Sequence, residues 1–418
     1  MKEIIKKIIA EFWDKSVTYI PRKKITEELA TAKSSIIITG PRRAGKSYTI
    51  YELRDMIMKK GAEKQDFLCI NFEDERLSDL KKEQLDLLLE AYYEMRDRKP
   101  IIFLDEIQNI VGWEKFIRRL ADDGYKVVAT GSNSEILSME IANRLGGRFL
   151  ETEIYPLDFK EFLTFKKMEI RREYLYSKER FKLKKYFDEY LLYGGFPEVA
   201  FFSEHENKIK VIKTYFNLVF YKDLIAKKEL ENETALRFII KKLRENIGNI
   251  ITPRAIYASL KNAGIEAGPN TVEKYIQYLE EAFLIIPCKH FAKSVSKQEK
   301  KKRYFVDNGY IKIFEVKEDL GLLLENLVFT EFIKKGKDVG YYQGKKECDF
   351  IVEGREAVQV AYNLNEENEG REVEGIIEAM KVCGLEKGII ITYDQEREIE
   401  KEGKKIQVVP AWKWALSL

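Results

Sequence analysis

The eight residues Gly40-Pro41-Arg42-Arg43-Ala44-Gly45-Lys46-Ser47 fit the pattern G-x-x-x-x-G-K-[ST]. An apolar, β-branched segment, Ser35–Thr39, precedes them, and a helical pattern over residues 46–59 follows. A strand, a glycine-rich loop and a helix in this order are the context in which the pattern marks a phosphate-binding loop. The sequence therefore predicts an α/β domain whose loop binds phosphate groups.

The composition of this loop explains how it would bind ATP. Its glycines let the backbone curl so that several N–H groups face one point, and the helix N-terminus adds positive potential. Lys46 is expected to reach the β- and γ-phosphates, and the Ser47 hydroxyl is expected to coordinate Mg²⁺. The expected nucleotide-binding residues are Gly40, Pro41, Arg42, Arg43, Ala44, Gly45, Lys46, Ser47 and Tyr48. The alternative is a glycine turn with a surface lysine.

A second motif, PIIFLDE, occupies residues 100–106 and ends in two acidic residues. Its apolar residues indicate a buried strand, and Asp105 stands at the carboxyl end, beside the phosphate loop in a parallel sheet. Asp105 is expected to hold Mg²⁺, directly or through water. Glu106 is the candidate that orients or deprotonates the attacking water, which favours hydrolysis over binding alone. The alternative is that Glu106 caps the next element.

The first third of the chain alternates strand-like and helix-like segments. The strand candidates besides Ser35–Thr39 are short and mostly apolar: residues 67–72, 100–104, 126–130 and 149–154. Helical patterns, among them residues 77–97, lie between them, and this repetition predicts a parallel sheet covered on both faces. We expect residues 67–72 to be an extra strand between the loop-bearing and Asp-bearing strands, as in additional-strand ATPases.

Further polar residues are candidates for contact with the γ-phosphate. The strand at 126–130 ends in Thr130, Ser132 and Asn133, and spacing alone does not choose among them; Asn133 is the catalytic candidate. A turn or a cap for a helix at residues 134–143 is the alternative. Arg144 or Arg148, with Arg148 as the catalytic candidate, could neutralise transition-state charge in its own subunit or in a neighbour's. Either arginine could equally be a surface residue.

The end of the second strand carries three more polar residues, Asn71, Glu73 and Asp74. They are candidates to line the same cleft, and a helix cap is the alternative. After Tyr155-Pro156 the pattern becomes mostly helical, and three helices followed by a hairpin between residues 235 and 306 are typical of a winged helix. The expected domains are an ATPase core, a helical lid, a winged helix and a small α/β domain, at residues 1–155, 156–234, 235–312 and 313–418.

The composition of the chain excludes several classes of protein. The chain has 418 residues, and its 73 Lys and Arg nearly cancel 70 Asp and Glu, so any nucleic-acid site must be a local patch. Four cysteines without a C-x-x-C pair and two histidines argue against a zinc finger or a His-rich metal site. No apolar run approaches ~20 residues and no signal-peptide pattern is seen, so we expect a soluble, cytoplasmic protein without a membrane span.

One local basic patch exists, in the loop at residues 293–303. The candidates for contact with double-stranded DNA are Lys297, Lys300, Lys301, Lys302 and Arg303. A basic wing could sit on phosphates and release counterions. The third helix of the winged-helix pattern carries Glu273, Glu280 and Glu281, which suit a DNA groove poorly. A solvated loop, or a winged helix that packs on the ATPase core, is the alternative.

The motifs GPRRAGKS, NFEDERL, FLDEIQN, ATGSNS and GGRF resemble those of archaeal and bacterial AAA+ ATPases that have a winged helix and a nuclease-like C-terminal domain. Later segments, YGGFPEV, RYFVDNGY and LLEN, agree with this resemblance. It implies an ATP-binding switch in the cytoplasm of an archaeon or bacterium. It implies no particular substrate or partner.

The last domain resembles the PD-(D/E)XK nuclease fold, in which a helix Glu, a strand Asp and an E-x-K motif bind Mg²⁺. Glu325 and Asp349 match the first two elements. Gln359-Val360-Ala361 stands where E-x-K belongs, so the resemblance implies a degenerate domain that does not cleave DNA. The alternatives are that Asp349 is an exposed edge residue and that Glu325 is a helix-surface charge.

Three functions follow from these patterns. The first is a Mg²⁺-dependent ATPase that converts ATP to ADP and phosphate and acts as a conformational switch on DNA, on a protein partner or within a homo-oligomer. The second is an ATP-regulated DNA-binding protein with little turnover, and the third is an ATP-gated nuclease.

Overall fold

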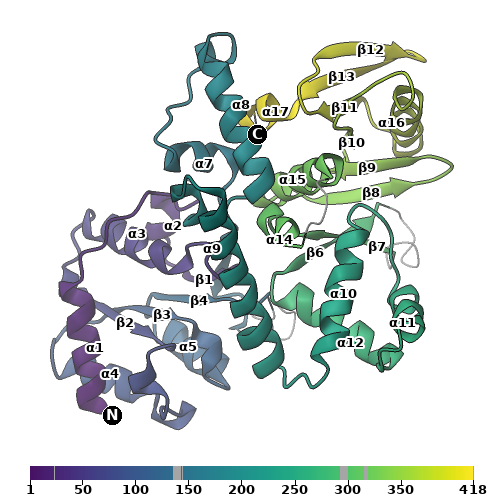
Figure 1. Cartoon of the computed structure of the whole chain (residues 1–418). Coiled ribbons are helices and arrows are strands. Elements are labelled where there is room, and N and C mark those ends of the chain that lie inside the picture. Colours follow the sequence, from purple (N-terminus) through teal and green to yellow (C-terminus); the bar gives the residue numbers. More distant parts are fainter. Residues whose placement is uncertain (23, 135–142, 144, 292–299, 315–318, 418) are drawn as a thin grey trace. The chain divides into compact units, whose positions relative to one another are not determined.

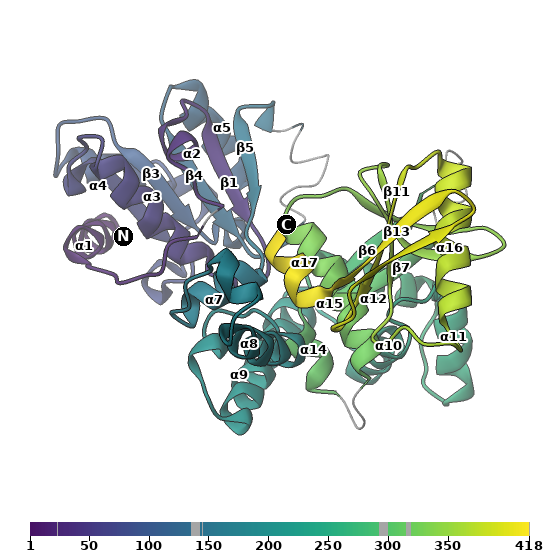
Figure 2. The same cartoon turned by 90° about the horizontal axis from the view of Figure 1, so that it is seen from above.

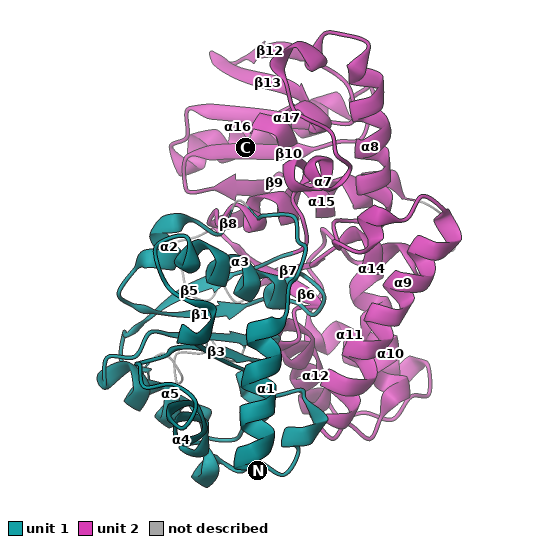
Figure 3. Cartoon of the chain, turned by 90° about the vertical axis from the view of Figure 1, so that its left-hand side faces the viewer, with its two compact units in different colours: residues 1–155 teal, residues 156–418 magenta. Residues whose placement is uncertain are grey.

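The computed structural model in Figure 1 describes residues 1–22, 24–134, 143, 145–291, 300–314 and 319–417. The chain forms two compact units, Met1–Tyr155 and Pro156–Leu418, which Figure 3 shows in different colours. The three regions expected after residue 155 therefore lie in one compact unit.

The first unit is built on a five-stranded parallel sheet, in the order β2-β3-β4-β1-β5. Its strands are β1 (Ser35–Thr39), β2 (Phe67–Asn71), β3 (Ile101–Asp105), β4 (Val127–Gly131) and β5 (Phe149–Glu153). Every residue of β1 and β4 is buried, as expected of central strands that are covered on both faces. The predicted parallel sheet is confirmed.

The predicted place of the second strand is wrong. β2 lies at the edge of the sheet, next to β3, and the strand between β1 and β3 is β4. Sequence order did not reveal this, because a crossover connection can carry the chain past a neighbouring position to the edge. As a result, the end of β4 lies between the phosphate loop and Asp105.

Helices cover the sheet of the first unit. They are α1 (Lys2–Asp14), α2 (Glu27–Thr31), α3 (Lys46–Met58), α4 (Leu87–Tyr93) and α5 (Trp113–Asp122). The long helix expected over residues 77–97 is wrong, because α4 covers only its middle. The reason is the spacing of Leu77, Leu80 and Leu85, which is similar to that of one face of a helix. These leucines lie in short turns and loops, and all three are buried in the same core.

The second unit contains many helices and one large sheet (Figure 1). Its helices are α7 (Phe159–Phe165), α8 (Glu179–Tyr193), α9 (His205–Leu218), the π-helical Val219–Ala226, α10 (Glu233–Glu245), α11 (Pro253–Asn262), α12 (Pro269–Glu281), α14 (Asn308–Lys312), α15 (Leu320–Lys334), α16 (Glu369–Cys383) and α17 (Ala411–Ser417). Thr252 caps α11 and Pro253 occupies its first turn, as the sequence predicts. No helix in the described part of the chain is long and apolar enough to span a membrane.

The sheet of the second unit has eight strands, in the order β12-β13-β11-β10-β9-β8-β6-β7 (Figure 1). Figure 2 shows β6, β7, β11 and β13 of this sheet from above. The strands are β6 (Ile285–His290), β7 (Lys301–Phe305), β8 (Val339–Gln343), β9 (Glu347–Val352), β10 (Glu356–Val360), β11 (Lys387–Thr392), β12 (Arg397–Lys401) and β13 (Lys404–Pro410). The hairpin β6–β7 follows three helices, as expected. It also continues into the C-terminal strands, because Lys289 and His290 pair with Gly340 and Tyr341 of β8.

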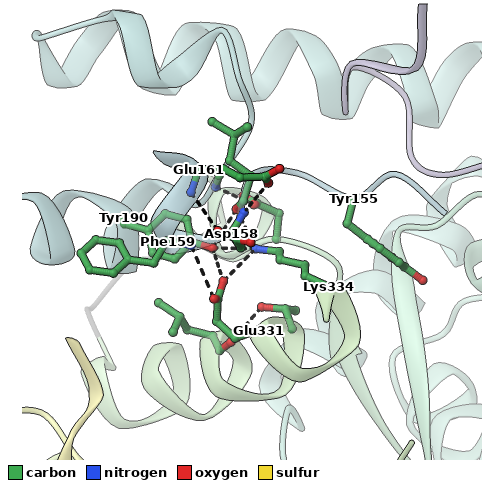
Figure 4. A network of polar contacts seen from close by, with 12 residues as sticks. Tyr155, Asp158, Phe159, Glu161, Tyr190, Glu331 and Lys334 are labelled. Carbon is green, nitrogen blue, oxygen red and sulfur yellow. Dashed lines mark hydrogen bonds and ion pairs between the residues drawn. The ribbon is translucent and has the colours of Figure 1, made fainter. Parts of the chain in front are cut away.

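Two sets of buried polar contacts hold the second unit together. In the first, Figure 4 shows the start of the unit tied to α8 and α15. The Tyr190 hydroxyl lies within hydrogen-bond distance of two acceptors, the Leu157 carbonyl (2.8 Å) and Glu331. The Lys334 ammonium donates to the same carbonyl (3.1 Å) and to the Tyr190 hydroxyl oxygen (2.7 Å). Burial raises the pKa of Glu331 above its ordinary value, and the charge of Lys334 opposes this only in part.

The second set joins the motifs YGGFPEV, RYFVDNGY and LLEN. The Asp307 carboxylate accepts the Gly195 N–H (2.7 Å), and the Asn326 amide binds the N–H and carbonyl of Phe305 (2.8 and 3.0 Å). Asn326 also donates to the Asn308 side chain (2.9 Å). These motifs therefore have a structural role in the second unit.

This arrangement predicts a strong effect of Gly194→Ala. Gly194 has φ +74°, and a Cβ there would lie 1.6 Å from Oδ1 of Asp307, which is 1% exposed. Backbone strain and the clash should together lower the free energy of unfolding by about 3 kcal/mol or more, measured by urea denaturation. Gly264→Ala is the matched control, because Gly264 has φ +69° and no atom within 4 Å of such a Cβ, so about 1–2 kcal/mol is expected. Equal losses would contradict the role given to Asp307.

Candidate active site

The phosphate loop joins β1 to α3 and curls around the Lys46 ammonium. Gly40 and Gly45 have φ of +141° and +104°, and a Cβ on Gly40 would lie 2.0 Å from the Ile154 carbonyl oxygen. Lys46 is only 4% exposed, and its Nζ donates to the carbonyls of Gly40 (3.0 Å) and Pro41 (3.1 Å). The loop therefore holds a fixed positive charge at the N-terminus of a helix, which suits a phosphate.

Asp105 at the end of β3 lies against this loop. The Ser47 hydroxyl donates to its Oδ2 (2.9 Å), and the Thr130 hydroxyl donates to its Oδ1. One hydroxyl and one carboxylate, completed by phosphate oxygens and water, match the way Mg²⁺ is held with a nucleotide. Within the described residues, no group of three or more His, Cys, Asp or Glu could hold a metal by itself. The residues thus fit a Mg²⁺ that arrives with a nucleotide.

Glu106 is held in an unusual backbone conformation beside the loop. Its φ and ψ of 54° and 46° are left-handed, and its N–H donates to the Thr130 hydroxyl (3.1 Å). Oε2 accepts hydrogen bonds from the Gln108 amide and from the Ser132 hydroxyl (2.9 Å), and Oε1 lies 3.9 Å from Lys46 Nζ. Backbone strain of this kind is found at functional sites, and here it aims a carboxylate at the ammonium that would bind the phosphates.

The two carboxylates differ in their electrostatics. Burial raises the pKa of Asp105 above its ordinary value, and hydrogen bonds from Thr130 and Ser47 oppose this only in part. Burial would also raise the pKa of Glu106, but the charges of Lys46 and Arg42 outweigh it and hold that pKa below its ordinary value. Glu106 is therefore an anion at neutral pH, which is the state a general base needs. A divalent cation at Asp105 would favour its charged form in the same way.

A hollow of about 470 Å³ opens beside Ser47 and Asp105. Asn71, Asp74 and Tyr48 line it, so two of the three polar residues at the end of β2 lie at the cleft. Tyr48 is 56% exposed. The third, Glu73, accepts a hydrogen bond from Nη1 of Arg42 (2.9 Å) and so orients a loop arginine.

The structure does not bring Arg148 to the phosphate loop. Arg148 precedes β5, whose first residue Phe149 pairs with Ser35, at the opposite end of β1 from Thr39 and the loop. Its side chain instead pairs with Asp122. A catalytic contact within its own chain is therefore wrong, and a role toward a neighbouring chain stays a prediction. Arg144 and most of the expected helix 134–143 lie outside the described residues.

The residues that contact the acidic pair differ in part from the expected ones. Thr130 binds Asp105 and Ser132 binds Glu106, so two of the three candidates at the end of β4 reach the pair. Asn133, the catalytic candidate, is buried next to them, and its role stays a prediction. Sequence reasoning missed Gln108, whose contact with Glu106 arises only because residues Ile107–Asn109 turn back as a short 3₁₀ helix.

Sequence reasoning also missed Arg22. Its guanidinium donates to the carbonyls of Ala44 (2.9 Å) and Tyr155 (3.0 Å), and its N–H donates to Glu52 (3.1 Å). Arg22 therefore braces the phosphate loop from an irregular segment. No motif marks such a residue, because its partners are up to 133 residues away.

The expected basic patch is only partly a surface. Lys302 and Arg303 are 1% and 8% exposed, and Arg303 Nε donates to Glu280 (3.0 Å), so both are wrong as DNA contacts. They are buried because β7 is paired with β6 and packed in the large sheet, which the local charge run did not reveal. Lys300 is exposed and Lys301 is half-buried, whereas Lys297 lies outside the described residues.

Comparison with known proteins supports the nucleotide-binding character of the first unit. A family model described as an AAA domain matches residues 32–163, and a domain of unknown function matches residues 184–316. The uncharacterized protein MJ1544 of Methanocaldococcus jannaschii is 34% identical over 91% of this chain and 88% of its own length. An uncharacterized protein of Haemophilus influenzae is 30% identical over 95% of this chain and 99% of its own.

Among solved structures, the Walker-type ATPase PABY2304 of Pyrococcus abyssi is similar over 70% of this chain and 93% of its own. The TM-score is 0.44 and the sequence identity is 14%. Similarity at this level carries no argument about function.

Proposed function

The chain belongs to the protein family represented by MJ1544 and its Haemophilus influenzae relative, and we propose that its AAA domain is an ATPase that converts ATP and water to ADP and phosphate with Mg²⁺. One observation carries this proposal: the Glu106 carboxylate and the Ser47–Asp105 contact lie at the mouth of one phosphate loop, around the Lys46 ammonium. A carboxylate placed to act as a general base is what hydrolysis requires beyond the binding of ATP.

Each residue has a role in this reaction. The backbone N–H groups of the loop and the Lys46 ammonium bind the phosphates, and Ser47 and Asp105 would hold Mg²⁺. Mg²⁺, when bound, supplies positive charge to the phosphate oxygens. Glu106 takes a proton from the attacking water as the water oxygen bonds to the γ-phosphorus and the bond from phosphorus to the leaving ADP oxygen breaks.

Phosphate release from ATP by the purified chain tests this function. We expect release that needs Mg²⁺ and stops when EDTA is added, because the phosphate oxygens then lose the positive charge of the ion. Chain that binds ATP but releases no phosphate would favour an ATP-regulated binding protein with little turnover.

Gln108→Ala tests how Glu106 is positioned. The Gln108 amide and the Ser132 hydroxyl hold the same carboxylate oxygen, so loss of one donor should let Glu106 turn away from the attacking water. Turnover should fall about 10- to 100-fold, while the affinity for ATP measured by calorimetry changes little. Gln407→Ala, at an exposed position of β13, is the control and should match the parent. Parental turnover in the Gln108 variant would contradict this positioning.

We further propose that the nucleotide state acts on the second unit as a conformational switch in the cytoplasm. The element order of α10, α11 and α12 followed by the β6–β7 hairpin supports a winged helix at residues 235–312 after a helical lid at 156–234. Residues 313–418 would form the nuclease-like domain. DNA or a protein is the proposed partner, and turnover measured with and without double-stranded DNA separates the two: stimulation favours DNA, and indifference favours a protein.

A further inference from the structure

A group of carboxylates lies in the second unit, away from the ATPase residues. It is contributed by three elements: Glu325 on α15, Glu347 and Asp349 on β9, and Glu372 on α16. Asp349 and Glu372 are buried, so the surface-edge alternative for Asp349 is wrong. Two buried carboxylates with two more beside them are stable as anions only with a positive charge nearby.

Lys302 of β7 provides a positive charge at this place. Its side chain is 1% exposed, forms an ion pair with Glu347, and lies with Nζ 3.9 Å from Oδ1 of Asp349. The same strand contributes Tyr304, whose hydroxyl donates to Oε1 of Glu325 (2.8 Å). The hairpin therefore reaches two of the acidic elements from one strand.

The connection between α10 and α11 lies against one of these carboxylates, Glu325. A Cβ on Gly248 would lie 2.5 Å from Oε1 of Glu325, so only a glycine fits against this carboxylate. Ile250, two residues further, pairs with Lys302 in an isolated β-bridge. Both the hairpin and this connection thus close the carboxylate group from the side of the expected winged helix.

The resemblance to PD-(D/E)XK nucleases implies a divalent metal at Glu325 and Asp349, and the residues present do not fit one. Gln359 replaces the second strand carboxylate, and its amide binds Glu372 (2.6 Å) and the Asp349 N–H (3.1 Å). Oδ2 of Asp349 accepts the Val360 N–H (2.8 Å). In the part of the chain that the structure describes, these carboxylates do not form a set that could hold a metal.

We propose that the Lys302 ammonium is the permanent cation of this carboxylate group, taking the place of a divalent metal, and that its ion pairs fasten the β6–β7 hairpin to the C-terminal sheet. A divalent ion would have to displace a buried ammonium. That ammonium would then lie unpaired in the interior, which is strongly unfavourable. The hairpin is consequently part of the sheet and not a free basic wing. This inference is independent of ATP hydrolysis, because it involves residues of the second unit alone.

Binding of Mn²⁺ tests the first half of the proposal. Free Mn²⁺ is titrated by electron paramagnetic resonance in the absence of nucleotide, with the parent chain and with Asp349→Asn. We expect superimposable curves, because Lys302 already occupies the group; any site in the first unit contributes equally to both. Loss of a Mn²⁺ site in the Asp349 variant would overturn the proposal.

A double-mutant cycle tests the second half. Lys302→Met keeps the length of the side chain but leaves Asp349 and Glu347 without their cation, so the thermal midpoint should fall by about 10 °C. Adding Asp349→Asn should recover a good part of this loss, because the two changes remove one interaction. Lys301→Met, on the same strand and half-buried, is the control and should stay close to the parent.

Two outcomes would contradict the fastening role. One is a Lys302→Met midpoint equal to that of Lys301→Met, and the other is a double variant whose loss is the sum of the single losses. If Lys302→Met is not recovered as folded protein, the double variant decides: its recovery as folded protein supports the proposal, and its failure to fold overturns it.

Discussion

Glu106→Gln is expected to reduce ATP turnover by about 10²- to 10⁴-fold while ATP binding remains near that of the parent. Gln has nearly the same shape and can keep the hydrogen bond from Ser132, but it cannot accept a proton from water. The Lys46 ammonium would lose a nearby negative charge, so binding of the triphosphate should not weaken. Phosphate release and calorimetric ATP binding, measured on the same preparation, check the two parts.

The control for this change is Glu83→Gln, at an exposed position of the same unit. It should leave turnover and binding unchanged. Parental turnover in the Glu106 variant would show that hydrolysis does not use this carboxylate as its base.

The same carboxylate sets an expectation for pH. Although burial raises the pKa of Glu106, the charges of Lys46 and Arg42 hold it below its ordinary value, so the anion persists to lower pH than for a free glutamate. Its contribution to turnover should therefore be constant through neutral pH and be lost only as the pH falls through that lowered pKa. Turnover that already falls between about pH 7 and 6 would indicate another titrating group, such as a histidine.

Lys46→Ala is expected to weaken ATP binding by about 100-fold or more. The change removes the charged donor that the loop surrounds, and it leaves the buried Glu106 carboxylate with one fewer positive neighbour. Both effects weaken the binding of a triphosphate. Calorimetric titration with ATP and Mg²⁺ measures the loss.

Lys59→Ala, at an exposed lysine just after α3, is the matched control, since it removes the same charge without touching the loop. A Lys46 variant that binds ATP as tightly as the parent would overturn the assignment of the nucleotide site. The two main variants also differ in pattern: Lys46→Ala should lose binding, whereas Glu106→Gln should bind without turnover.

Much of the proposed nucleotide site could be predicted from the sequence because its parts are local. Gly40 to Ser47 are consecutive, and a phosphate loop requires this spacing and these conformations within one turn of chain. Asp105 and Glu106 were recognisable because they end an apolar strand, and carboxyl ends of parallel strands meet at one edge. Strand positions followed from short β-branched segments in the same way.

The errors have a common cause. Residues 67–72 were placed between two strands, yet β2 is an edge strand, because strand order results from the packing of all five strands. The spacing of Leu77 and Leu85 predicted a helix, but both residues lie in short turns whose side chains are buried in the core. Arg148 lies just before the first residue of β5, away from the phosphate loop, and this position depends on the register of β5 with β1.

Consecutive residues were therefore enough to predict a phosphate loop and its acidic strand, because those signals depend on backbone conformation and hydrophobic periodicity within a few turns of chain. Only the folded chain revealed that Gln108 and Ser132 hold Glu106, that Arg22 braces the loop, and that Lys302 is buried beside Asp349. Gln108 is only two residues from Glu106 and reaches it through a tight turn, whereas the other contacts join segments distant in sequence. The burial and charge balance of those distant contacts arise only when the sheets are assembled.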